Sequence, residues 1–103
     1  MSLFSSTSIA VLSSCDTVMN EARRRFEAGI FPVNASVISR TQSAGRGTHG
    51  RTWVSTEGNL YAALRLDAGL MQAGLLAPQL VSACLLRVVK DLGVEAKLKW
   101  PND

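Results

Sequence analysis

The sequence predicts an α/β (α+β) fold in which a mixed sheet carries flanking helices, and three observations lead to this expectation. Short β-prone stretches alternate with two amphipathic helical stretches along the chain. Glycines stand where both helical stretches end. The chain has 103 residues, of which 47% are hydrophobic and 18% charged, which suits one small globular domain.

The first half of the chain predicts a strand, a helix and a second strand. Residues 8–14, SIAVLSS, form a short β-prone stretch. Asp16 or Thr17 then supplies an N-cap oxygen, apolar residues recur at helical spacing, and Gly29 stands where a helix of about three turns stops. Residues 35–40, ASVISR, are rich in β-branched side chains and predict the second strand.

The second half predicts a strand, a long helix and a last strand. Residues 59–66, NLYAALRL, fit a helix or a strand by period, and we favour a strand because the stretch is short and bounded by glycines. Residues 73–92 predict a helix that Gly93 stops, with Pro78 in its first turn or at a mild kink. Residues 95–100, EAKLKW, alternate like a half-buried strand. The apolar stripe of the helix is Leu76, Leu80, Cys84, Val88 and Leu92.

Composition excludes several classes of protein. The net charge is a mild +3, and no apolar run approaches the roughly 20 residues that span a bilayer, so we expect neither a membrane nor a nucleic-acid partner. The two cysteines, Cys15 and Cys84, lack metal-ligand spacing and suit reduced thiols in the cytoplasm. Residues 12–15, LSSC, loosely resemble a lipoprotein cleavage box, but no Lys or Arg precedes them.

The stretch SAGRGTHGRTW, residues 43–53, gathers glycines and arginines around the single histidine. Glycines allow the backbone N–H groups to turn inward and arginines add fixed positive charge, so the stretch suits a phosphate or a carboxylate. A surface loop whose arginines face water, or an RNA-binding arm of glycine and arginine, are the alternatives. The residues concerned are Gly45, Gly47, Gly50, Arg46 and Arg51.

The roles of His49, Trp53 and the closing stretch KWPND are less clearly indicated by the sequence. His49 has no Cys, Asp or second His nearby and is given no role. Trp53 either anchors the loop in the core or lays its ring against a nucleotide base. The closing KWPND is either a strand leading into a turn, or it places Lys99 on a phosphate and the Asp103 carboxylate on Mg²⁺.

The ordered set SRTQSAGRGTHGRTW, EGNLYAALRL, a long helix and KWPND resembles the biotin protein ligases, within the wider biotin and lipoate ligase family. The resemblance covers the chain from about Cys15 to Asp103. It implies a sheet similar to that of class II aminoacyl-tRNA synthetases. It also implies ATP-dependent formation of biotinyl-5′-AMP, with ATP, Mg²⁺ and biotin bound, and transfer of biotin to a lysine of a biotin carboxyl carrier protein.

The resemblance also implies roles for individual residues. Arg46 meets the biotin carboxylate and then the phosphate, and Lys99 faces the ATP phosphates, so these two carry the catalysis. Asp103 holds the metal. Thr17 keeps the hydroxyl that the family uses on the biotin ureido ring. The residues expected to bind biotin or nucleotide are Thr17, Gln42, Gly45, Arg46, Gly47, Gly50, Arg51, Trp53, Asn59 and Asn102.

The sequence departs from the family pattern in ways that lead to rival expectations. Val18 stands where a threonine is usual, and Thr48 where many members carry an arginine. The C-terminal half of the catalytic domain and a DNA-binding domain are not found, so residues 1–103 predict a partial domain with little activity alone. A lipoate or octanoate ligase is the nearest rival. Another is a non-catalytic remnant that forms a homodimer across an open sheet edge or joins a complementary fragment.

Overall fold

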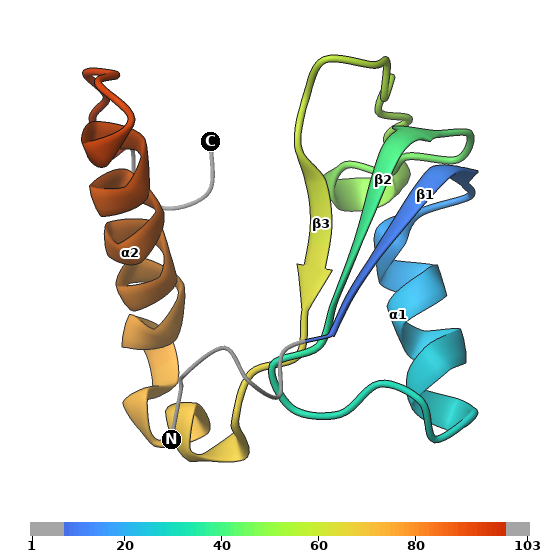
Figure 1. Ribbon diagram of the computed structural model, residues 1–103, viewed down its shortest axis with the longest axis horizontal. Coiled ribbons are helices and arrows are strands. Elements are labelled where there is room, and N and C mark those ends of the chain that lie inside the picture. Colours follow the sequence, from blue (N-terminus) through green and yellow to red (C-terminus); the bar gives the residue numbers. More distant parts are fainter. Residues whose placement is uncertain (1–7, 99–103) are drawn as a thin grey trace. The chain divides into compact units, whose positions relative to one another are not determined.

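The computed structural model describes residues 8–98, and the chain divides into two compact units. The sheet unit comprises Met1–Asp67 and the helical unit comprises Ala68–Asp103. The elements follow in the order β1, α1, β2, β3 and α2, with short 3₁₀ segments before β3 and before α2 (Figure 1). The mixed α/β character predicted from the sequence is confirmed.

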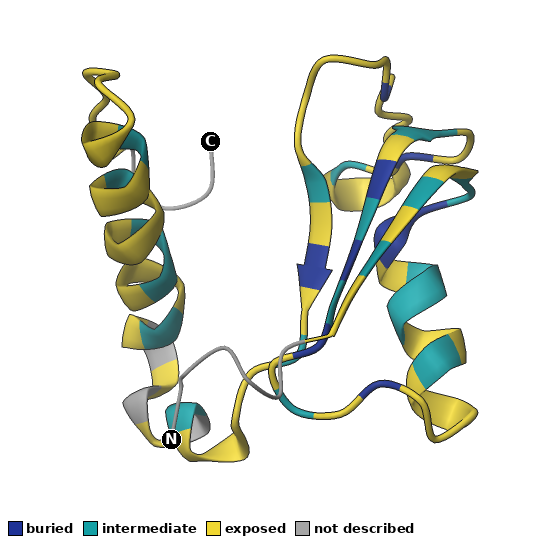
Figure 2. Cartoon of the chain, in the orientation of Figure 1, coloured by how far each residue is buried: buried dark blue, intermediate teal, exposed yellow. Residues whose placement is uncertain are grey.

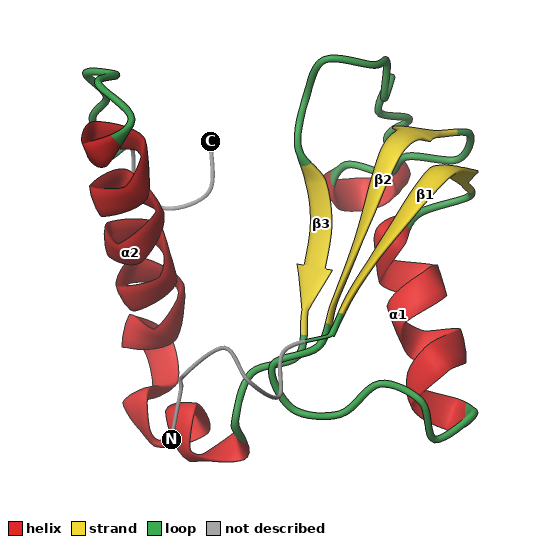
Figure 3. Cartoon of the chain, in the orientation of Figure 1, coloured by secondary structure: helices red, strands yellow, loops and turns green. Residues whose placement is uncertain are grey.

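A three-stranded mixed sheet forms the centre of the sheet unit (Figure 3). Strands β1 (Ile9–Cys15) and β2 (Ser36–Gln42) pair in parallel, and β3 (Tyr61–Leu64) pairs antiparallel with β2. Parallel neighbours need a crossover connection, and the helix α1 supplies it. All three strands lie where the sequence predicted them.

Helix α1 (Val18–Glu27) starts and stops for the local reasons that its sequence predicts. Thr17 is the N-cap: its backbone is extended and its hydroxyl oxygen accepts the N–H of Asn20 at 3.0 Å. After the helix, Gly29 adopts a positive φ of 75°, which a residue without Cβ takes at little cost. The helix therefore begins and ends at defined residues.

The core of the sheet unit is small and lies between α1 and one face of the sheet. The register places Ala10, Val37 and Ala63 side by side on neighbouring strands, and Val37, in the middle strand, is 0% exposed. Val18, Phe31 and Ala35 complete the buried cluster (buried residues are dark blue in Figure 2). Alternate residues of β1 face away from this core and are exposed, as the two-residue period of a strand requires.

The helical unit corrects two predictions. The long helix, α2, comprises Ala77–Asp91, not residues 73–92, because Gly74 takes a non-helical backbone (φ 56°, ψ −124°) inside the 3₁₀ segment Ala68–Leu76. Pro78 therefore lies in the first turn, where its missing N–H costs no hydrogen bond. The predicted stripe residues Leu76, Leu80, Cys84, Val88 and Leu92 are all exposed.

The strand predicted over residues 95–100 is wrong for its described part. Residues 95–98 have no regular structure, and the remaining two lie outside the described residues. An alternating pattern becomes a strand only when a neighbour accepts its backbone hydrogen bonds. Within residues 8–98 the sheet consists of β1, β2 and β3. In the same part of the chain, the helices are too short or too polar to cross a membrane.

A cluster of charged side chains ties the residue before α1 to the helix itself. The two guanidinium nitrogens of Arg24 donate to the two carboxylate oxygens of Asp16, at 2.7 and 3.1 Å. Glu21 accepts from Arg24 and from Arg25. The Arg24 guanidinium, the Asn20 amide and the Thr17 N–H hold the pKa of Asp16 well below its usual range, and Arg24 likewise lowers the pKa of Glu21.

This cluster predicts a pH dependence of stability. A carboxyl group whose pKa is lowered by folding stabilises the native state above its ordinary pKa, and the contribution is lost as the pH falls. Asp16→Asn should therefore reduce the free energy of unfolding at pH 7, and the difference from the wild type should shrink below the ordinary aspartate pKa of 3.8. Urea unfolding at pH 7, 5, 3 and 2 measures it. A difference that stays constant over this range would contradict the assignment.

Candidate functional site

A pocket of about 420 Å³ lies in the sheet unit, at the edge where β2 ends and β3 begins. Its volume falls within the range of small-molecule sites. Four segments meet there: the start of α1, the last residue of β2, the glycine-rich loop (residues 43–53) and the start of β3. The lining residues are Thr17, Val18, Met19, Gln42, Arg46, Trp53, Leu60, Tyr61 and Ala62.

The side-chain amide of Gln42, at the end of β2, bonds to the start of α1 and to Ser55, which lies two residues after the glycine-rich loop. Its Oε1 accepts the backbone N–H of Val18 at 2.7 Å, and its Nε2 donates to the hydroxyl of Ser55 at 3.1 Å. Because a backbone N–H can only donate, the oxygen of the amide must face α1 and the nitrogen must face Ser55. The second hydrogen of Nε2 is then left for a ligand in the pocket. Gln42 thus both stabilises the site and offers a donor.

Thr17 combines a structural role with a possible contact to a ligand. Its hydroxyl oxygen caps α1, and the residue is 5% exposed while lining the pocket. A hydroxyl has one hydrogen and two acceptor lone pairs, and the cap uses one lone pair. The hydrogen and the second lone pair remain for a polar group of a ligand.

The glycine-rich loop folds back on itself as a narrow hairpin. The N–H of Trp53 donates to the carbonyl of Gly45 at 2.8 Å, and the N–H of Gly47 donates to the carbonyl of Arg51 at 2.6 Å. The tip is a 3₁₀ turn, Thr48–Gly50, in which Gly50 has a φ of 73°. These backbone bonds hold the two arms of the loop to each other.

Gly45 is required by close packing and not by its backbone angles. A Cβ atom at this position would collide with the hydroxyl oxygen of Ser55 and with the carbonyl oxygen of Trp53. At Gly47 the nearest atom to such a Cβ is the Cβ of Arg51, at 3.5 Å, an ordinary contact. The two glycines therefore serve different purposes.

Arg46 provides the positive charge of the pocket, and its position depends on α1. Among the lining residues that the structure describes, it is the one cation. Its Nη2 donates to Oδ1 of Asn20 at 3.0 Å. Arg46 and Arg51 are both exposed, but Arg51 lies outside the lining set, as do the predicted site residues Gly45, Gly47, Gly50 and Asn59.

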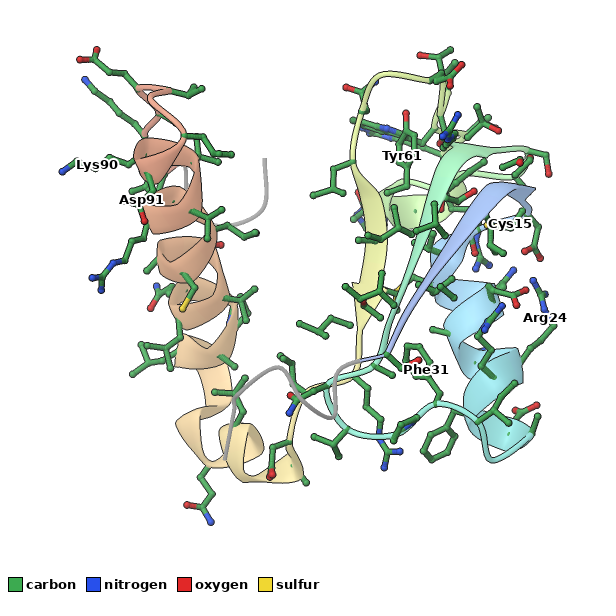
Figure 4. All side chains as sticks on the ribbon, viewed as in Figure 1. Cys15, Arg24, Phe31, Tyr61, Lys90 and Asp91 are labelled. Atoms are coloured by element: carbon green, nitrogen blue, oxygen red, sulfur yellow. The ribbon has the colours of Figure 1, made fainter. Side chains whose placement is uncertain are left out.

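Two aromatic side chains contribute to the pocket. Trp53 is 62% exposed, so the interpretation that it anchors the loop in the core is wrong. Tyr61 packs against the buried cluster, and its hydroxyl donates to the carbonyl of Thr56 at 2.8 Å (labelled in Figure 4). An exposed indole beside a fixed phenol can hold a flat or apolar group of a ligand.

The site contains residues that the sequence did not single out, and others that the structure does not place. Ser55 and Asn20 make side-chain contacts across 13 and 26 residues of sequence, and no local pattern signals such pairs. Lys99, Asn102 and Asp103 lie outside the described residues. Within residues 8–98 no group of three or more His, Cys, Asp or Glu side chains is placed to hold a metal.

The fold defines an α/β protein with a pocket of small-molecule size, and comparison with known proteins gives its family. The model of the biotin/lipoate A/B protein ligase family matches residues 12–103, and the chain belongs to this family. The chain is 33% identical over 100 residues to the bifunctional ligase/repressor BirA of Escherichia coli (strain K12), covering 93% of this chain and 30% of that protein. Over 79 residues it is 35% identical to BirA of Bacillus subtilis (strain 168), covering 70% and 23%.

Two solved structures share the fold. Biotin acetyl coenzyme A carboxylase synthetase from Helicobacter pylori, with bound biotinylated ATP, has a TM-score of 0.76 at 26% identity, covering 94% of this chain and 48% of that one. Biotin protein ligase from Leishmania major, in complex with biotinyl-5-AMP, has a TM-score of 0.66 at 31% identity, covering 93% and 46%. The chain thus spans less than half of each solved chain and under a third of each sequence relative.

The packing at Gly45 yields a prediction about the loop. Gly45→Ala should lower the free energy of unfolding by about 1–3 kcal/mol, because Ser55 or the Trp53 carbonyl must move to admit the methyl group. Gly47→Ala, in the same loop, is the matched control and should cost less, since its new methyl meets open or ordinary contacts. Chemical denaturation of both variants measures the difference. Equal losses would show that Gly45 is not held by this packing.

The amide of Gln42 yields a second prediction. Gln42→Leu should lower the free energy of unfolding by about 1–3 kcal/mol, because it leaves the N–H of Val18 without its partner at the start of α1. Gln42→Glu keeps an acceptor for that N–H and places a negative charge at a helix N-terminus, so it should cost less. Thermal unfolding of the two variants compares them. If the leucine variant is as stable as the glutamate variant, the amide does not hold α1.

Proposed function

We propose that this chain forms the N-terminal part of a biotin protein ligase catalytic domain and carries its biotin site. The observation that supports this most is the pocket, where one arginine, the hydrogen-bonding groups of Thr17 and Gln42 and two aromatic rings meet. Biotin has the matching parts, namely a carboxylate, a polar ring and an apolar body. The likeness to a solved chain with bound biotinylated ATP, over 94% of this chain, supports the same ligand class.

The proposed reaction has two steps, each a displacement. A carboxylate oxygen of biotin attacks the α-phosphorus of ATP, the bond to the bridging oxygen breaks, and pyrophosphate leaves with biotinyl-5′-AMP formed. The amine of a carrier-protein lysine then attacks the acyl carbon, AMP leaves, and the nitrogen loses a proton. Both steps need alignment and charge neutralisation more than an enzyme nucleophile. Arg46 is the group proposed to neutralise the carboxylate and later the phosphate.

Each remaining site residue has a proposed place in this scheme. The hydroxyl of Thr17 and the free hydrogen of Gln42 Nε2 bind the polar ring, and Trp53 covers the adenine. Gly45, Gly47 and Gly50 shape the loop, and Arg51 and Asn59 approach the nucleotide from outside the pocket. Lys99 and Asn102 for the ATP phosphates, and Asp103 for Mg²⁺, remain predictions from the sequence. The proposed acceptor is a biotin carboxyl carrier protein.

A lipoate or octanoate ligase is the second candidate, and Val18 favours it. Val18 lines the pocket with methyl groups where a threonine would add a hydroxyl, so this side of the pocket offers less to a ureido ring. Its backbone N–H is already bonded to Gln42. Thermal shift with biotin, lipoate and octanoate separates the two candidates, because the cognate acid stabilises the native state more at equal concentration.

The function is tested by titrating biotin and a non-hydrolysable biotinyl-adenylate analogue into the chain by calorimetry. We expect the wild type to bind both, and Arg46→Ala to weaken binding about tenfold to a hundredfold through loss of a charged hydrogen bond. Arg23→Ala removes the same charge from the exposed surface of α1 and serves as the matched control. A folded wild-type chain that binds neither ligand would contradict the proposed function.

A further inference from the structure

A chain of polar contacts connects Arg46 to the body of α1. The Arg46 guanidinium donates to Oδ1 of Asn20 at 3.0 Å, and Nδ2 of Asn20 donates to Oδ2 of Asp16 at 3.0 Å. Arg24, two turns along the helix, grips both oxygens of Asp16 at 2.7 and 3.1 Å. Arg46 is therefore connected, through Asn20, to the ionic cluster of Asp16 and Arg24 at the start of α1.

The two ends of the Asn20 amide are not interchangeable. A guanidinium can only donate hydrogen bonds, so it must meet the amide oxygen. An ionised carboxylate can only accept, so it must meet the amide nitrogen. Arg46 and Asp16 thus impose the same orientation on Asn20, and its oxygen is held towards the loop.

In this chain of contacts the charge of Asp16 is paired with an opposite charge, whereas Arg46 contacts a neutral amide. Asp16 is bidentate with Arg24, which satisfies its negative charge. Asn20 stands between Asp16 and Arg46 and carries no charge. Arg46 is therefore held by a neutral acceptor, and its positive charge is not cancelled by a carboxylate at that contact.

We propose that Asn20 is a positioning residue for Arg46, holding its guanidinium at the rim of the pocket while leaving its charge for an anionic ligand. The inference rests on the proposed function for the identity of the anion, the biotin carboxylate. A carboxylate in place of Asn20 would hold Arg46 as well, but it would compete with the ligand for the same charge. An apolar residue would release the arginine and increase the entropy lost on binding.

The first test is a double-mutant cycle read by calorimetry with biotin and its neutral amide. Asn20→Leu should weaken biotin about threefold to tenfold, the value of one hydrogen bond, and should leave the neutral amide almost unchanged. In the Arg46→Ala background the same substitution should change biotin binding by less than about twofold. A purely structural role predicts equal losses for both ligands and in both backgrounds, which would overturn the proposal.

Asn20→Asp is the second variant. It tests whether Arg46 needs a neutral acceptor, because an aspartate can hold the guanidinium but also neutralises its positive charge. It keeps an oxygen for Arg46 and brings a negative charge beside the guanidinium, and it also replaces the N–H donor to Asp16 with a second carboxylate. We expect it to weaken biotin binding at low salt, and added salt should reduce the loss because it screens the new charge. Biotin binding at wild-type strength in this variant would overturn the claim that a neutral acceptor is needed.

The positioning itself is measured without a ligand, by NMR relaxation of the Arg46 side-chain N–H. We expect restricted motion in the wild type and in Asn20→Asp, and faster motion in Asn20→Leu, with circular dichroism confirming that each variant is folded. An Arg46 that moves equally in the wild type and in Asn20→Leu overturns the proposal. If the motion differs as expected but no variant binds biotin, the positioning role stands and the proposed function fails.

Discussion

The hydrogen bonds of one half-buried amide hold the pocket together. Gln42 ends the central strand β2, and its side chain reaches the first N–H of α1 on one side and the buried hydroxyl of Ser55 on the other. Ser55 is 6% exposed, so a missing partner there would leave a polar group without water. Helix, strand and hairpin are each short, and this amide sets the distance between them. The walls of the pocket depend on that distance.

The same arrangement decides which groups can recognise an anion. A helix N-terminus is often an anion site because its first N–H groups are unpaired. In α1 the N–H of Val18 is bonded to Gln42 and that of Asn20 to Thr17, so these donors are already used. Arg46 is the one cationic side chain among the described residues that line the pocket, so we expect it to meet a negatively charged group there. The helix contributes through Asn20, which orients that arginine.

The sequence predicted the elements whose ends have local causes. The N-cap at Thr17 and the stop at Gly29 depend on side chains and backbone freedom within a few residues, and both lie where expected. Of the strand predicted over residues 95–100, the described part, residues 95–98, is wrong, because strand pairing depends on a distant partner. The start of α2 was predicted wrongly for another reason. The apolar period continues through Gly74, but the backbone of Gly74 is not helical.

The same distinction applies to the site. Glycines and arginines within eleven residues indicated an anion-binding loop, but the pattern gave every arginine equal weight. The folded hairpin separates them: Arg46 lines the pocket and bonds to Asn20 of α1, whereas Arg51 lies outside the pocket lining. Neither Asn20 nor Ser55 had a local signal, because their partners come from the other end of the loop or from another element. Motif composition therefore predicted an anion-binding loop, and tertiary contacts decide which arginine of the motif lies at the pocket.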